Sequence, residues 1–319
     1  MRIEGLIAAT FGAFNEDGSL NLLLIPSIVD KMVEDGLSGV FICGTNGEGP
    51  NLTIEERMLV AEAYVKAARK RILVLVHVGH PSIAEAKKLA IHAEKIGADA
   101  ISSVAAFYFK PTSALNLANS IGEIAAAAPS LPFYYYHIPH LTGVIVDMVE
   151  FLFLSEKLIP NLAGIKYTAT TIHEYQACLN YQNGRYDMLY GLDEMFLSAL
   201  AVGAKGAIGS TYTFAAPLYL KVRELFSNNM QFEARQLQFK MVEMVRCLVK
   251  FAPIPAQRAV MKMQGFELGP SRLPLVDLTG QEFAALKTAL DNIGFFELLH
   301  KQVTATQLAR TGTVSVNNN

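Results

Sequence analysis

The chain has 319 residues, 51% of them hydrophobic, and a formal net charge of -2 at pH 7. This near-neutral charge provides no basic field that would gather nucleic acid or an anionic membrane, and no run approaches the ~20 apolar residues that a membrane-spanning helix needs. A chain of this length is long enough to bury a large core, so we expect a soluble globular protein.

The N-terminus and the cysteines bear on the compartment. The apolar run that begins at Gly5 is short and is typical of a first strand rather than of a signal peptide. Cys43, Cys178 and Cys247 lie far apart and match no disulfide or metal-binding spacing. The histidines show no zinc-site spacing either, so no metal is expected. The sequence therefore predicts a cytoplasmic protein.

Eight short apolar runs are predicted to be strands, and amphipathic segments predicted to be helices separate them. Strict alternation of strand and helix favours a parallel sheet with the helices outside, and eight repeats close an α/β (β/α)8 TIM barrel. The alternative is an open doubly wound sheet, but no glycine-rich nucleotide-binding turn follows an early strand. The predicted strands are 5–10, 39–44, 72–78, 100–105, 133–138, 162–168, 188–191 and 207–210; the predicted helices include 22–35, 54–69, 82–96 and 193–202.

The pattern changes after the eighth strand. Residues 1–225 are predicted to form the barrel domain, and residues 226–302 a helical extension packed on the barrel or between subunits. The last stretch, 303–319, is rich in Thr, Gln and Asn and is predicted to be a flexible tail. In TIM barrels the active site lies at the carboxyl ends of the strands, so residues at those ends are the candidates for chemistry.

Lys166 is the most informative of these positions. Its strand is otherwise apolar or small, and alternation places it on one face with Gly164 and Thr168. Burial would lower the pKa of a lysine towards a neutral amine, and such an amine condenses with a ketone to give an iminium that accepts electrons from the adjacent carbon–carbon bond. The alternative is a strand-end lysine whose ammonium group reaches solvent, and this strand alone does not decide between the two.

Two tyrosines lie on the strand before Lys166. Tyr134 and Tyr136 share a face, so either one could be a packing residue. A phenol beside an iminium could instead carry the proton that carbon–carbon cleavage must move. With a pKa near ~10 it would need a relay of hydroxyls, and Thr45 and Tyr108 are the candidates at neighbouring strand ends.

Two further groups have competing interpretations. The loop Gly44-Thr-Asn-Gly-Glu48 offers amides and a hydroxyl that could hold a carboxylate, although the same residues are common in ordinary turns. Asp193 and Glu194 open a predicted helix, where favourable charge at the helix N-terminus is the simpler explanation of their position.

Taken together, the motifs from residue 3 to about 296 resemble those of the N-acetylneuraminate lyase and dihydrodipicolinate synthase superfamily. The resemblance rests on Gly-Thr-Asn-Gly-Glu (44–48), Tyr-His-Ile-Pro (136–139), Gly-Ile-Lys-Tyr-Thr (164–168) and Gly-Ser-Thr-Tyr (209–212), each at its expected strand.

The resemblance implies a role for each candidate. Lys166 would form the Schiff base with a 2-keto acid, and Tyr136 would shuttle the proton. Thr45 and Tyr108 would complete the relay, with Tyr108 contributed to a neighbouring subunit of a homotetramer, a dimer of dimers. Thr45 and Asn46 would hold the pyruvyl carboxylate, although family members more often have Thr or Ser where Asn46 stands. No cofactor is implied beyond the lysine.

Leu141 bears on the branch of the family. By the same resemblance, a dihydrodipicolinate synthase would have an arginine at this position to bind the carboxylate of its second substrate. Leucine cannot pair with a carboxylate. The resemblance therefore favours reversible cleavage of N-acetylneuraminate to N-acetylmannosamine and pyruvate. Another pyruvate-dependent aldolase, acting on a 2-keto-3-deoxy sugar acid or of the dihydrodipicolinate synthase type, and a non-catalytic sialic acid sensor stay open. In the favoured branch the residues that line the sugar end are Thr168, Gly191, Asp193, Glu194 and Ser210.

Overall fold

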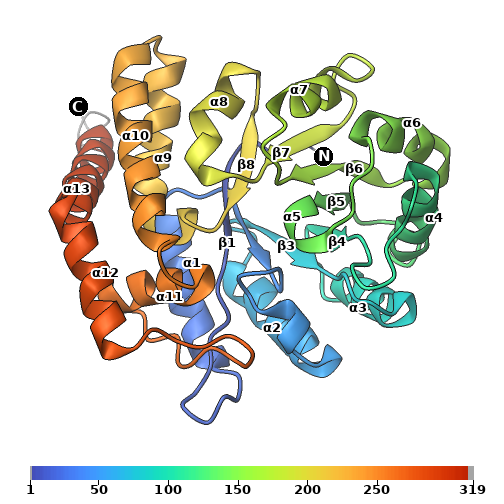
Figure 1. Cartoon of the computed structure of the whole chain (residues 1–319), viewed down its shortest axis with the longest axis horizontal. Helices are drawn as coiled ribbons and strands as arrows, with labels where there is room; N and C mark the ends of the chain where they lie inside the picture. The colour runs from blue at the N-terminus through green and yellow to red at the C-terminus, as the bar shows by residue number, and fades with distance from the viewer. Residues whose placement is uncertain (1, 315–319) are drawn as a thin grey trace.

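The computed structural model describes residues 2–314, and the side chains among them up to residue 305. Eight parallel strands close into a barrel in chain order, with β1 paired to both β2 and β8 (Figure 1). The predicted (β/α)8 TIM barrel is thus confirmed, strand by strand. The strands are β1 (Gly5–Ala9), β2 (Gly39–Ile42), β3 (Leu73–His77), β4 (Ala100–Val104), β5 (Phe133–His137), β6 (Leu162–Tyr167), β7 (Asp187–Tyr190) and β8 (Gly206–Gly209).

Helices surround the barrel, and their ends follow local sequence signals. The Thr-x-x-Glu spacing of Thr53 and Glu56 predicts a capping box at the start of α2, and the box is present: Thr53 Oγ1 accepts from the Glu56 amide at 3.2 Å, and the Thr53 amide donates to the Glu56 side chain at 2.9 Å. Two predicted helices begin with a 3₁₀ turn, η1 (Leu22–Leu24) before α1 and η3 (Asp193–Met195) before α8. The surrounding elements are α1 (Ile25–Glu34), η2 (Gly49–Asn51), α2 (Ile54–Ala68), α3 (Ile83–Lys95), α4 (Ala114–Ala125), α5 (Pro139–Thr142), α6 (Met148–Leu158), α7 (Ile172–Asn180), α8 (Phe196–Ala201) and α9 (Tyr212–Ser227).

The apolar side chains form two cores, one between the strands and the helices and one inside the barrel. Because successive strand residues point to opposite sides, Tyr134 and Tyr136 enter the barrel interior while Tyr135 packs outwards on Phe151. Register then aligns side chains between neighbouring strands: Tyr136 on β5 lies opposite Lys166 on β6. The side chains of Tyr136 and Lys166 therefore lie next to each other inside the barrel, near the carboxyl ends of their strands.

The C-terminal extension consists of α10 (Gln231–Leu248), α11 (Pro253–Met263), α12 (Gly280–Asn292) and α13 (Phe295–Val314). In Figure 1 these helices, orange to red, form one flank of the molecule beside α9. The boundary predicted at residue 225 falls inside α9, which continues to Ser227. The tail predicted from residue 303 begins within α13, which continues to Val314, while residues 315–319 lie outside the described residues.

Among the described residues, none of the helices has the length and apolar character required to cross a membrane.

Candidate active site

A cavity of about 440 Å³ opens at the carboxyl ends of the strands. It gathers nearly all of the predicted site residues, although they come from five strand ends and are spread over more than 160 positions of the chain. Tyr108 is the exception, since it is 79% exposed and does not line the cavity of its own chain. The predicted residues that line the cavity are Thr45, Asn46, Tyr136, Lys166, Thr168, Gly191, Asp193, Glu194 and Ser210.

Lys166 is buried at the floor of this cavity, with only 3% of its surface exposed. Its Nζ lies 3.8 Å from the ring centre of Tyr136 and 4.0 Å from that of Phe41. Desolvation lowers the pKa of Lys166 from 10.5 to about 7, an effect that the carboxylate of Asp193 opposes. The burial of the side chain rules out the alternative of a solvent-reaching lysine, and the lowered pKa favours the uncharged, nucleophilic amine.

Tyr136 shares the interior face of β5 with Tyr134, but the two phenols have different environments. The Tyr134 hydroxyl donates to Asp187 at 2.8 Å, and Asp187 also accepts from the Ile3 amide at 2.9 Å, so Tyr134 is tied to the amino end of the barrel. Burial raises the pKa of Tyr136 to about 12, and the nearby hydroxyls of Thr45 and Thr168 oppose the shift. Tyr134 is the packing residue of the pair, and Tyr136 faces the cavity.

Asp193 lines the cavity from η3, the 3₁₀ turn that follows β7. Its Oδ2 accepts from the amide of Thr211 at 2.8 Å and from the Thr211 hydroxyl at 2.7 Å. Burial raises the pKa of Asp193 to about 6, and the Thr211 hydrogen bonds oppose the rise. Asp193 is 4% exposed and also stands in the first turn of η3, so its position fits both the helix N-terminus and a role as a wall of the cavity.

Two glycines make room for these side chains. A Cβ at Gly209 would overlap the carboxylate of Asp193, and one at Gly191 would overlap the hydroxyl of Thr168. Both positions require glycine because a polar side chain of the site occupies the space that any side chain would fill.

The loop between β2 and η2 carries Thr45 and Asn46 at the cavity wall. The Asn46 side-chain amide donates to the Ala9 carbonyl at 3.3 Å, and the Asn46 carbonyl accepts from the amide of Gly12. One N–H of the Asn46 side chain is therefore engaged with β1, which leaves its second N–H and the Thr45 hydroxyl as side-chain donors.

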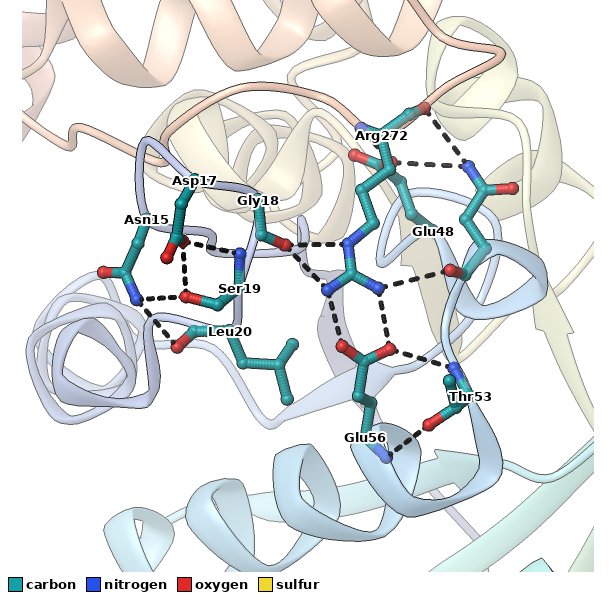
Figure 2. Close-up of polar contacts among 10 residues, drawn as sticks. Asn15, Asp17, Gly18, Ser19, Leu20, Glu48, Thr53, Glu56 and Arg272 are labelled. Atoms are coloured by element: carbon teal, nitrogen blue, oxygen red, sulfur yellow. Dashed lines mark hydrogen bonds and ion pairs between the residues drawn. The ribbon is translucent and has the colours of Figure 1, made fainter.

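The segment between α11 and α12 forms hydrogen bonds with the end of this loop and with the start of α2 (Figure 2). Glu48, which has a left-handed backbone with φ of 52°, accepts from the Arg272 amide at 2.9 Å. The Arg272 guanidinium donates to both oxygens of Glu56, at 2.7 and 2.6 Å, and to the carbonyl of Gly18. Leu275, three residues beyond Arg272, reaches the cavity wall. The extension thus supports the loop that carries Thr45.

Sequence reasoning missed the part of the cavity that comes from the extension and from α5. The residues of the extension match no motif, and the most distant of them, Leu275, lies 63 residues beyond the last motif, which ends at Tyr212. The missed lining residues include His140, Pro253, Ile254, Gln257 and Leu275.

These features define an α/β barrel that holds one desolvated lysine beside a tyrosine at the carboxyl ends of its strands, an arrangement suited to covalent Schiff-base chemistry. The chain belongs to the dihydrodipicolinate synthetase family, whose model matches residues 2–293.

Its relatives include proteins named N-acetylneuraminate lyase. The pig protein is 39% identical over 306 residues, which are 93% of this chain and 96% of that protein, and the one from Xenopus tropicalis is 40% identical over 86% of this chain and 91% of its own. Among solved structures, the N-acetylneuraminate lyase of Proteus mirabilis superposes with a TM-score of 0.90 at 36% identity, covering 92% of this chain and 100% of that one. A Ruminococcus gnavus structure described as a sialic acid aldolase catalytic lysine mutant gives 0.86 at 30% identity, with 92% and 97% covered.

Proposed function

We propose that the protein is a carbon–carbon lyase that cleaves N-acetylneuraminate reversibly to N-acetylmannosamine and pyruvate through a Schiff base on Lys166. The observation that carries the proposal is the buried amine of Lys166, whose pKa of about 7 leaves it nucleophilic inside a polar-rimmed cavity. The names of the relatives, at 39% and 40% identity over most of the chain, support the same substrate.

In this reaction the neutral amine of Lys166 adds to the C2 ketone of the open-chain sugar, and loss of water gives a protonated imine. A base removes the proton of the C4 hydroxyl, the C3–C4 bond breaks, and its electron pair moves into the iminium to form an enamine. The released aldehyde is N-acetylmannosamine. Protonation of the enamine at C3 and hydrolysis of the imine free pyruvate and regenerate the lysine, so atoms and charges balance without a cofactor.

Tyr136 is the group proposed to carry the proton, because its ring lies beside the Lys166 amine and the nearby hydroxyls of Thr45 and Thr168 oppose the rise of its pKa on burial. Thr45 and Asn46 are proposed to hold the pyruvyl carboxylate. Beyond C3, the hydroxyl groups of the sugar chain are hydrogen-bond donors, and the carboxylates of Asp193 and Glu194 are suitable acceptors. The residues proposed to bind that end are Thr168, Gly191, Asp193, Glu194 and Ser210, all of which line the cavity.

The residues that line the cavity argue against the alternative of a dihydrodipicolinate synthase type, which would condense aspartate semialdehyde with pyruvate. Leu141 lines the cavity and offers no charge for a second substrate carboxylate. Within the described residues, Lys166 is the one lysine or arginine among the lining residues, so a second substrate carboxylate would have no cation to pair with. A 2-keto-3-deoxy sugar acid would meet no such obstacle and is the second candidate substrate.

We also propose that the protein works as a homotetramer in which Tyr108 reaches the cavity of a neighbouring subunit. Tyr108 and Phe109 are 79% and 85% exposed and pack edge to face, and Ile145 is 88% exposed, which is costly for a monomer. Light scattering should give a tetramer, and Tyr108→Ala should lower turnover; unchanged turnover would remove Tyr108 from the relay. The three cysteines are free and buried, which supports the proposed cytoplasmic location.

The substrate is tested by an assay of pyruvate release. N-acetylneuraminate, its N-glycolyl form and 2-keto-3-deoxygluconate are compared as substrates, and aspartate semialdehyde plus pyruvate is tested for condensation. The proposal expects the highest kcat/KM with N-acetylneuraminate. A preference for deoxygluconate or for the semialdehyde would replace it with the corresponding alternative, and binding of sialic acid without release of pyruvate would favour the sensor.

A further inference from the structure

One side chain of the C-terminal extension reaches the element that carries the acidic pair of the cavity. Gln238, on α10, is 7% exposed, and its side-chain amide faces η3 and the start of α8. Its Nε2 donates to the carbonyls of Asp193 at 3.2 Å and Glu194 at 3.1 Å, and its Oε1 accepts from the amide of Leu197 at 3.2 Å. All three bonds go to main-chain groups of the segment 193–197.

This segment needs partners from outside. The N-terminal residues of η3 and α8 make no side-chain capping hydrogen bond, and the first amides of a helix have no acceptor within it. A single primary amide matches the arrangement, because it offers two donors to the two carbonyls and one acceptor to the N–H of Leu197. The opposite orientation of the amide would set its oxygen against two carbonyl oxygens, so the bonds also fix the side chain.

We propose that Gln238 is a positioning residue for the sugar end of the substrate, and this inference rests on the proposed function. Gln238 does not line the cavity. It acts through the main chain of Asp193 and Glu194, whose residues line the cavity. On this view α10 is part of the machinery that sets substrate preference, and the extension does more than cover the barrel.

The two halves of the cavity are supported separately. The keto-acid end depends on Lys166 and on the Thr45 loop, which β1 and the Arg272 segment hold in place. The sugar end depends on η3, which Gln238 holds from α10. A change at Gln238 should therefore affect the sugar end much more than the condensation of pyruvate with Lys166, which Asp193 influences only through its charge.

The test uses the whole protein with three substitutions. Gln238→Met keeps the length of the side chain and removes all three hydrogen bonds. Gln238→Glu keeps an acceptor for Leu197 but places carboxylate oxygen against the two carbonyls. Gln236→Met is the matched control, because Gln236 lies on the exposed side of the same helix.

Two quantities are measured for each variant: the KM for N-acetylmannosamine in condensation with pyruvate, and the rate at which cyanoborohydride traps pyruvate on Lys166 with no sugar present. A shift in the position of η3 near 1 Å is expected to raise the KM of Gln238→Met about tenfold or more, with a smaller rise for Gln238→Glu. Pyruvate trapping and the Gln236→Met variant should stay within about twofold of wild type.

The proposal is overturned if the KM for N-acetylmannosamine is unchanged, or if it rises only in proportion to a fall in pyruvate trapping, which is the signature of a general structural role. If Gln238→Met does not fold, Gln238→Glu decides by the same two quantities. Failure of the proposed function is seen separately, as wild-type protein that forms no N-acetylneuraminate; the comparison is then made with the aldehyde acceptor that wild type accepts.

Discussion

The contact between Gly209 and Asp193 offers a demanding test of the site. Gly209 ends β8, and a Cβ placed on it would overlap the Asp193 carboxylate, lying 2.7 Å from its Oδ2 and nearer still to its Oδ1. Gly209→Ala therefore adds one methyl group against a side chain that is itself buried. Since ordinary van der Waals contact begins at 3.4 Å, the carboxylate must withdraw by roughly 1 Å or more.

The cost can be worked from the bonds that the withdrawal breaks. Asp193 accepts two hydrogen bonds from Thr211, and bonds to a charged group are worth about 1.5–3 kcal/mol each, so losing both costs roughly 3–6 kcal/mol. If β8 shifts instead, overpacking costs about 1–3 kcal/mol. We expect a lower Tm and a kcat/KM for N-acetylneuraminate that falls about a hundredfold, the effect of a 1 Å misplacement.

The assay compares pyruvate release from N-acetylneuraminate with pyruvate trapping on Lys166, which should change far less. Gly280→Ala is the matched control, because a Cβ at Gly280, in the first turn of α12, meets nothing within 4 Å. If Gly209→Ala cleaves the sugar at the wild-type rate, Asp193 is not held where the substrate needs it and the reasoning is refuted.

Three further changes follow from the burial of Lys166 and Tyr136. With a pKa of about 7, the neutral fraction of Lys166 rises about tenfold from pH 6 to pH 8, and the initial rate of pyruvate trapping should rise with it; a flat profile would contradict the pKa. Because the pKa of Lys166 in the folded protein lies below the ordinary 10.5, the folded state loses stability as the pH falls from 10.5 towards 7. Lys166→Met should therefore raise the Tm at pH 7. A lower Tm would argue against a desolvation cost at Lys166. Tyr136→Phe should lower kcat about a hundredfold or more with little change in Tm; retained turnover would assign proton transfer to another group.

Much of the barrel could be predicted because its signals are local. Eight apolar runs, the alternation along the strand of Lys166 and the Thr53–Glu56 capping box each depend on residues within a few positions of one another, and the structure confirms them. The ends of the helices were predicted less accurately. The helix predicted over residues 193–202 begins with the 3₁₀ turn η3, which has no side-chain capping hydrogen bond.

What could not be predicted depends on distant partners. The choice between Tyr134 and Tyr136 required Asp187, which binds Tyr134 from β7. The burial of Asp193 required Gly209, the last residue of the next strand, and Thr211, two residues further along the chain. Sequence alternation could place both tyrosines on one face, but only the assembled barrel separates a packing residue from a cavity residue.

The cavity wall contributed by the extension escaped prediction for the same reason. Pro253, Ile254 and Leu275 carry no chemistry of their own and reach the cavity because α11 and the segment of Arg272 fold back over the barrel. In the sequence, Gln238 is an ordinary polar residue of a predicted helix. Its proposed positioning role follows only from its hydrogen bonds to three main-chain groups.

The most direct measurement is borohydride reduction of the protein in the presence of pyruvate, followed by peptide mass spectrometry. A cavity that keeps one amine uncharged beside Tyr136 predicts a single carboxyethyl adduct on the peptide that contains Lys166, and none on Lys166→Met. An unmodified Lys166, or equal labelling of the surface lysines, would contradict it.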